Sequence, residues 1–172
     1  MEKKKNITSC EVIKDNGQQT ARDLKFANQW AQALLEGITE REPDGNMTSV
    51  NMREVLRKCS RACYDRSRYD EVIKEADLDD FLSRAHEIFG WTIDYDKAAG
   101  KLIVYENNTE CICPLARACN GKVAQSLCTC SETELERIFS RAYGGKVVAK
   151  VLKGVLKGDG CCVYQVQLLK KI

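Results

Sequence analysis

The sequence predicts an α+β domain, with helices in its N-terminal half and an antiparallel sheet in its C-terminal half. Apolar residues recur at three- and four-residue steps up to about residue 90, which is the spacing of amphipathic helices. Beyond that point they alternate, as in strands with one buried face, and turn-forming residues separate the segments. We expect a basic and polar tail over 1–17 and a single domain over 18–172, with a helical part over 18–90 and a sheet part over 91–172.

The first helix is expected from Thr20 to about Ile38. Its apolar residues fall on one face at helical spacing: Leu24, Ala27, Ala31, Leu34, Leu35 and Ile38. The sequence Pro-Asp-Gly-Asn over 43–46 combines residues that favour turns and therefore ends this helix.

The second helix should begin near Thr48 or Ser49, either of which can cap it, and continue to about Tyr64. Its apolar face is formed by Met52, Val55, Leu56, Cys59 and Cys63. After a polar stretch that can be helical, Asp77 can cap a third helix that Gly90 stops. This helix buries Leu78, Phe81, Leu82, Ala85, Ile88 and Phe89.

The sheet part begins with a predicted hairpin over 91–105. The sequence Ser-Glu-Thr-Glu over 131–134 has the capping-box pattern, so a helix should begin there and end at Gly144. Two further strands are expected over 146–156 and 161–169, joined by a turn.

The charge balance argues against several classes of partner. Lys and Arg total 27 against 25 Asp and Glu, so a net charge of +2 favours neither nucleic acid nor an anionic membrane. The basic start has no apolar run of a secretory signal, and no segment has the roughly 20 apolar residues of a membrane helix. We therefore expect a cytoplasmic protein with reduced thiols, in which the three Asn-x-Thr sequons carry no meaning.

The ten cysteines are the strongest chemical signal in the sequence. Cys59 and Cys63 lie four residues apart on one helix face, a spacing that suits two corners of a tetrahedral metal site. The pairs Cys111-x-Cys113 and Cys128-x-Cys130 leave open which member would reach a shared ion. Any single cysteine is equally well read as a small core residue, but paired spacings across the chain favour one metal site. Thiolates favour zinc, with an iron–sulfur cluster as the alternative.

Other catalytic signals are weak. His86 is the only histidine, which excludes multi-histidine metal sites and most histidine-based triads. We interpret it as a surface or boundary residue.

The last third of the sequence resembles known families through four short motifs. These are Cys-Ile-Cys-Pro-Leu at 111–115, Leu-Cys-Thr-Cys at 127–130, Gly-Gly-Lys-Val at 144–147 and Gly-Asp-Gly-Cys-Cys-Val-Tyr at 158–164. Together they resemble an uncharacterised family of bacterial cysteine-rich proteins. The final hairpin is more distantly similar to the 4-vinyl reductase domain, a small-molecule-binding module also found in phenol-responsive sensors, and to the L-2-amino-thiazoline-4-carboxylic acid hydrolase-like family.

The resemblance to the sensor domains implies a zinc ion held largely by cysteines. Cys130 and Cys162 occupy two of the ligand places, and Cys113 stands about where an acidic ligand is expected. Gly154 departs from the pattern, close to where a further cysteine would fall, and Cys59 or Cys63 could replace that ligand. The expected metal ligands are therefore drawn from Cys59, Cys63, Cys113, Cys130 and Cys162.

The same resemblance implies a pocket for a hydrophobic or aromatic small molecule. Phe89, Trp91 and Tyr164 are the candidates to line it, between the helices and the sheet. In the last strand, alternation places Cys162 on the side of Tyr164 and Cys161 on the other side.

The leading hypothesis is a small-molecule-binding or sensory module with a structural zinc. The alternative is a hydrolase acting on a small heterocyclic or amide substrate, through an open zinc site or a cysteine nucleophile among Cys111, Cys113, Cys128 and Cys130. Redox sensing by paired thiols is a third interpretation. The sequence leaves a homodimer open.

Overall fold

The computed structural model describes residues 16–39, 51–75, 77–118, 123 and 125–169. The helices are α1 (Asn16–Thr39), α2 (Met52–Arg66), α3 (Tyr69–Val72), α4 (Leu78–Phe89), α5 (Pro114–Ala118) and α6 (Thr129–Tyr143), with short 3-10 turns at η1 (Gln125–Cys128) and η2 (Val155–Lys157). The strands are β1 (Thr92–Asp96), β2 (Lys101–Tyr105), β3 (Val147–Lys153) and β4 (Val163–Leu168). They form one antiparallel sheet in the order β1-β2-β4-β3, so the predicted α+β class is confirmed.

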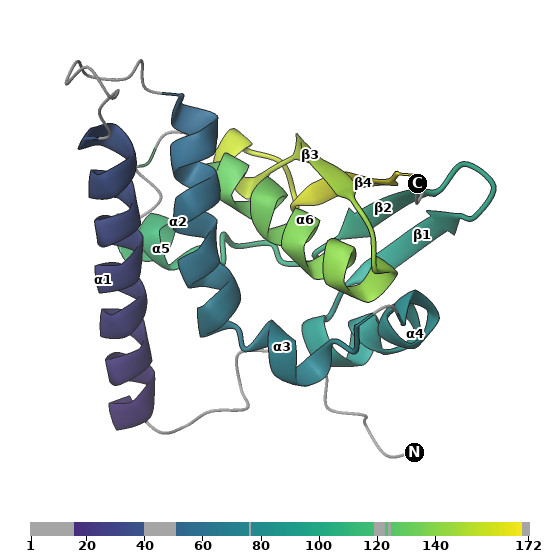
Figure 1. The fold of residues 1–172 in the computed structure, drawn as a ribbon, viewed down its shortest axis with the longest axis horizontal. Coiled ribbons are helices and arrows are strands. Elements are labelled where there is room, and N and C mark those ends of the chain that lie inside the picture. The colour runs from purple at the N-terminus through teal and green to yellow at the C-terminus, as the bar shows by residue number, and fades with distance from the viewer. Residues whose placement is uncertain (1–15, 40–50, 76, 119–122, 124, 170–172) are drawn as a thin grey trace.

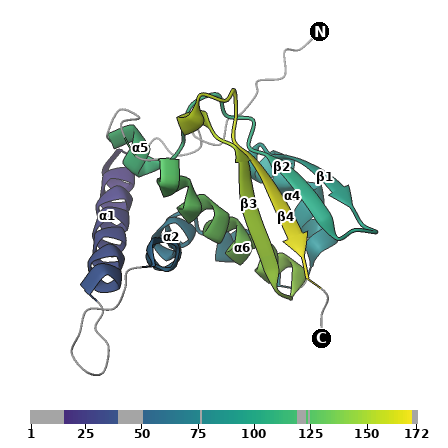
Figure 2. The ribbon, with the colours of Figure 1, turned by 90° about the horizontal axis from the view of Figure 1, so that it is seen from above.

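The helices pack outward from the sheet (Figures 1 and 2). α6 lies against the sheet, α2 packs on α6, and α1 packs on α2. α4 contacts both α6 and β1. The main core therefore lies where α4 and α6 meet the sheet.

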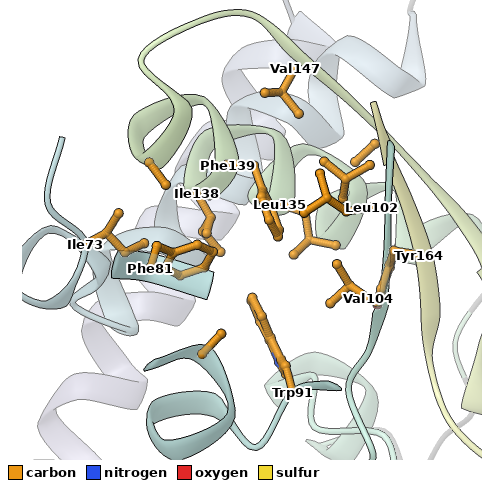
Figure 3. Packing of buried hydrophobic residues seen from close by; sticks show 14 of the residues in the cluster. Ile73, Phe81, Trp91, Leu102, Val104, Leu135, Ile138, Phe139, Val147 and Tyr164 are labelled. Carbon is orange, nitrogen blue, oxygen red and sulfur yellow. The ribbon is translucent and has the colours of Figure 1, made fainter. Parts of the chain in front are cut away.

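Aromatic side chains fill that core (Figure 3). Phe81 of α4 meets Phe139 of α6 edge to face, with ring centroids 5.3 Å apart. Trp91 lies against Phe89 at 4.8 Å and against Phe81 at 6.5 Å. From the sheet, Leu102, Val104, Tyr164 and Val166 are buried in the same cluster. Aromatic contacts of this kind add stability beyond the apolar area they bury.

Several expected local signals are confirmed. The Asp77 side chain accepts a hydrogen bond from the Asp80 N–H at 3.1 Å, so it caps α4 as predicted. Gly90 and Gly144 end α4 and α6 in the left-handed region, at φ +71° and +66°. The hairpin of β1 and β2 also forms in the predicted segment.

The buried face of α1 differs from the prediction. Leu24 and Leu35 are 62% and 58% exposed, and Ala27 and Ala31 are exposed as well. Leu34 and Ile38 do pack toward α2 as predicted, but they are joined by Trp30 and Ala33, and the buried residue of the helix is Phe26. α2 is the main element against which α1 packs. The helix is therefore rotated so that its bulky aromatic side chains, which gain most from burial, face α2.

Element boundaries also differ in places. The predicted caps Thr48 and Ser49 lie outside the described residues, and Asn51 caps α2 by accepting the N–H groups of Arg53 and Glu54. α1 begins at Asn16 and so takes in the last two residues of the expected tail. The strand expected to reach residue 156 ends at Lys153, since Val155–Lys157 forms a 3-10 turn. The single-domain organisation stays a prediction.

The start of α6 corrects the capping-box interpretation of 131–134. The helix begins at Thr129, and Cys128 at its N-cap makes no side-chain capping bond. Ser131 and Glu134 therefore lie within the helix. η1 ends at Cys128 and α6 follows it directly, so the helix begins two residues earlier than predicted. The Glu134 side chain is turned inward.

Two carboxylates of α6 satisfy the free edge of β3. Glu132 accepts the Val151 N–H at 2.9 Å, and Glu136 accepts the Ala149 N–H at 3.1 Å. Arg53 of α2 pairs with Glu132 at 2.6 Å and with Glu136 at 3.5 Å. This network joins α2, α6 and β3, and it occupies N–H groups that an edge strand otherwise leaves unpaired.

Replacing Glu132 by Gln should lower the free energy of unfolding by about 1–3 kcal/mol, because the buried network loses its charge-assisted bond to Arg53. Glu54→Gln is the matched control: Glu54 is exposed on α2 and pairs with Arg57 at 3.5 Å, so its loss should cost about 0.5 kcal/mol or less. Urea denaturation of both variants measures the difference. Equal effects would contradict the role given to the network.

Candidate functional site

Most of the described cysteines lie near one another at one end of α6. They come from four separate parts of the chain: α2, the loop after β2, the start of α6 and the start of β4. All eight described cysteines are free: Cys59, Cys63, Cys111, Cys113, Cys128, Cys130, Cys161 and Cys162. Their environments divide them into two groups.

The first group consists of Cys63, Cys113 and Cys130. Burial raises the pKa of the Cys63 thiol strongly, and the neighbouring Glu134, Cys130 and Cys113 raise it further. Burial likewise raises the pKa of Cys130 to about 12. Three thiols from distant parts of the sequence thus share one poorly hydrated region, where an uncompensated thiolate is unfavourable.

Cys113 differs from the other two in its hydrogen bonds. Its sulfur accepts the backbone N–H groups of Leu115 and Ala116, which oppose the rise in pKa caused by burial. The turn is formed locally, because Pro114 begins α5 and the Cys113 carbonyl accepts the Arg117 N–H at 3.0 Å. Two N–H donors on one sulfur favour the thiolate form.

Glu134 belongs with the first group, although the only sequence signal at this residue was the capping-box pattern. Burial and the nearby Glu106 together raise the pKa of this carboxyl to about 8, although a hydrogen bond from Tyr69 opposes the rise. Burial also raises the pKa of Glu106 to about 7, against a hydrogen bond from Cys162. Both residues still keep part of their surface accessible to water, so they border a space that water reaches.

The second group contains Cys111, Cys128 and Cys162. Burial raises the pKa of Cys128 to about 11, with Cys162 and Cys111 as further causes. Burial also raises the pKa of Cys162, whose sulfur accepts the Val155 N–H. Tyr164 lies between the groups, since its hydroxyl hydrogen-bonds with Ser131 and lies near Glu106, Cys162 and Cys128.

Cys59 and Cys130 also have ordinary core roles. They pack with Val55 and Leu56 in a small apolar cluster between α1, α2 and α6. The Cys59 thiol donates to the Trp30 carbonyl at 3.7 Å, and the Cys130 thiol donates to the Leu56 carbonyl at 3.6 Å. The indole N–H of Trp30 is buried and has no well-aligned hydrogen-bond partner in the described part of the chain, although it lies close enough to Cys130 to favour a thiolate there.

No group of three His, Cys, Asp or Glu side chains among the described residues is arranged closely enough to hold a metal ion. The five expected ligands are thus brought into one region but not into a closed shell. Cys63, Cys113 and Cys130 lie near one another, Cys59 lies near Cys130, and Cys162 belongs to the second group. Cys10 and Cys119 lie outside the described residues.

A separate surface pocket of about 290 Å³ lies between α4 and β1. It is lined by Leu82, His86, Trp91, Thr92, Ile93 and Tyr95. Of the three expected pocket residues, Trp91 lines it, Phe89 stacks behind Trp91, and Tyr164 lies in the core between the cysteine groups. His86 is exposed, as interpreted from the sequence, and its Nδ1 lies 3.2 Å from the Trp91 carbonyl oxygen.

No helix in the described part of the chain has the length and apolar character to cross a membrane.

Comparisons with known proteins give low similarity throughout. No protein-family model matches the chain, and a search of curated proteins gave no match. Among solved structures, it is similar to a trafficking protein particle complex subunit 3 from Naegleria fowleri covalently bound to palmitic acid, with a TM-score of 0.47 and 10% identity over 90% of this chain and 98% of that chain. It is also similar to a vinyl-4-reductase family protein from Methanocaldococcus jannaschii, with a TM-score of 0.33 and 10% identity over 92% of this chain and 99% of that chain. Because both TM-scores are below 0.5 and both identities are 10%, neither structure assigns a family or an activity to this chain.

Proposed function

We propose that this chain is a small-molecule-binding module whose thiol-rich interior holds a structural zinc ion. The observation that supports the zinc is that Cys63, Cys113, Cys130 and Glu134 lie in one buried region, close enough for the other three to raise the pKa of Cys63. Three sulfurs and one carboxylate oxygen form a donor set that zinc accepts in tetrahedral geometry. Zinc would supply the positive charge that offsets deprotonated thiols in this buried region.

The hydrogen bonds around the donors support thiolates at two positions. Cys113 already receives two backbone N–H groups, so its turn suits a charged sulfur. The unpartnered Trp30 N–H would gain a strong acceptor if Cys130 were a thiolate. Second-shell donors of this kind orient and stabilise metal ligands in other proteins.

Closing the site requires the four side chains to approach one another, since they do not form a ready shell in this structure. Cys59 and Cys162 were also expected as ligands. We place them beside the ion, because Cys59 donates to the Trp30 carbonyl and Cys162 faces Glu106 and Cys128.

The donors come from three segments: α2, the turn that precedes α5, and α6. A shared ion would therefore join segments that are far apart in sequence. Binding energy would then contribute directly to folding. Four protein ligands leave no open position for a substrate water, which favours a structural role over the hydrolase alternative.

The small-molecule part of the proposal is carried by the pocket at Trp91. Its wall is mainly apolar and aromatic, with the His86 ring and the Thr92 hydroxyl as polar groups. Its volume of about 290 Å³ suits a ligand of roughly the size of a substituted benzene ring. We therefore assign it a small aromatic ligand.

Protein purified without chelator should carry about one equivalent of zinc, and removal of the ion should lower the melting temperature by roughly 10 °C or more. Metal analysis together with thermal denaturation under reducing conditions measures both. Zinc below about a tenth of an equivalent, or an unchanged melting curve after confirmed removal, would contradict the proposal. Iron with visible absorption would favour the cluster instead.

Cys113→Ser should abolish zinc retention, because it removes the sulfur that two N–H groups already stabilise. Cys161→Ser is the control, since Cys161 lies outside the thiol group and should keep its zinc and stay within about 1 kcal/mol in stability. The metal content of the two purified variants decides the assignment. Equal zinc in both would place the ion elsewhere.

Phenol should quench the fluorescence of Trp91 saturably, with a dissociation constant of about 1 mM or below, in a Trp30→Phe background that leaves Trp91 as the reporter. Tyr95→Ala should weaken binding because Tyr95 lines the pocket. Tyr105→Ala is the matched control, as Tyr105 is a similarly half-buried tyrosine on the neighbouring strand outside the pocket. The absence of saturation, or an equal effect of both variants, would remove the aromatic ligand from the proposal.

A further inference from the structure

A second pocket, of about 200 Å³, lies between α1 and the end of α2. Its lining is strongly basic. Arg22 and Lys25 contribute from α1, and Arg66 and Arg68 contribute from the end of α2 and the turn that follows. Among the described residues Asp65 is the only acidic one that lines it, so cations outnumber anions at its wall.

The helix geometry gathers these groups on one side of the pocket. Arg22, Lys25 and Gln29 follow one another at three- and four-residue steps, which places them on the same face of α1. Phe26 is buried at 3% exposure and lines the same pocket. The Arg66 guanidinium lies over its ring, 5.9 Å from the centroid, which holds that cation at the pocket.

The two carboxylates beside the pocket, those of Asp65 and Glu71, are each paired with an arginine. Asp65 pairs with Arg61 on the preceding turn of α2 at 2.8 Å. Arg68, held in the left-handed region at φ 55°, pairs with Glu71. Within the described residues neither Arg22 nor Lys25 forms a salt bridge, so their charge is available to a ligand.

The C-terminus of α2 explains part of this clustering of cations without a ligand. The partial negative charge at the C-terminus of α2 attracts cations, which accounts for Arg66 and Arg68. It does not account for Arg22 and Lys25, because they come from the N-terminal half of a different helix. Their placement opposite the two arginines makes a cavity with cations on both walls.

From this geometry we infer a binding site for a small phosphomonoester, with its phosphate between the α1 and α2 cations and its organic part toward Phe26. A phosphate dianion offers several oxygens to converging guanidinium and ammonium donors, and it offsets more of the excess charge than a single carboxylate. The volume of the pocket admits a compact molecule, such as a phosphorylated triol or a small sugar fragment.

Calorimetric titration of the full chain with glycerol 3-phosphate tests the site. We expect a dissociation constant of about 1 mM or below at low salt, weakened by added salt, and no binding of glycerol. The double variant Arg22→Gln/Lys25→Gln should bind at least about tenfold more weakly. Lys150→Gln/Lys153→Gln is the matched control, because it removes equal charge from exposed positions on β3 and should leave the affinity unchanged.

Vesicles of phosphatidic acid in phosphatidylcholine distinguish a lipid headgroup from a free metabolite, as both present the same phosphate. Vesicle binding that the α1 double variant weakens and the β3 control does not would assign the phosphate to a lipid. Binding of glycerol 3-phosphate alone would assign it to a free molecule. Equal losses in both double variants, or no saturable binding to either probe by variants that melt as the parent does, would overturn the site.

Discussion

The arrangement of the whole molecule depends on α6 being buried on two sides at once. One side contributes Leu135, Ile138 and Phe139 to the main core, and the other contacts α2. Between these sides Glu132 and Glu136 bind the backbone of β3 and the guanidinium of Arg53. A buried carboxylate is tolerated only when such partners are in place, so the positions of α2 and β3 are fixed relative to one helix.

The same constraint creates the thiol-rich end of the structure. α6 follows η1 directly, and no side-chain hydrogen bond caps its N-terminus. The first turns of α6 bring Cys130 and Glu134 near Cys63 of α2. The loop carrying Cys113 closes the region. Burial raises the pKa of each of these groups, which disfavours their charged forms unless a cation or hydrogen-bond donors offset the cost. The region therefore combines the chemistry of a soft metal site with the packing of a core.

The two surface pockets have opposite chemical character. The pocket between α4 and β1 is formed by aromatic and aliphatic side chains around Trp91. The pocket between α1 and α2 is ringed by cations around Phe26. The first borders the main core and the second lies on the outermost pair of helices, so the two can accept different ligands on one scaffold.

By itself the sequence determined the local structure wherever short-range chemistry was sufficient. Asp77 and Gly90 delimit α4, the turn before Lys101 makes the hairpin, and alternation places Tyr164, Val166 and Leu168 on the buried side of β4. Capping bonds and left-handed glycines act within a few residues, and side-chain direction in a strand follows from its pleat. Those features could therefore be predicted without knowledge of any partner segment.

Only the tertiary structure decided which faces and which charges are buried. It rotates α1 so that Phe26 is buried and Leu24 exposed, because α2 is the main element against which that helix packs. It divides the cysteines into two groups and places Glu134 among three thiols, although in sequence that residue fitted an exposed capping position. Burial and electrostatic coupling depend on atoms contributed by segments far apart in the chain, and no local pattern contains those distances.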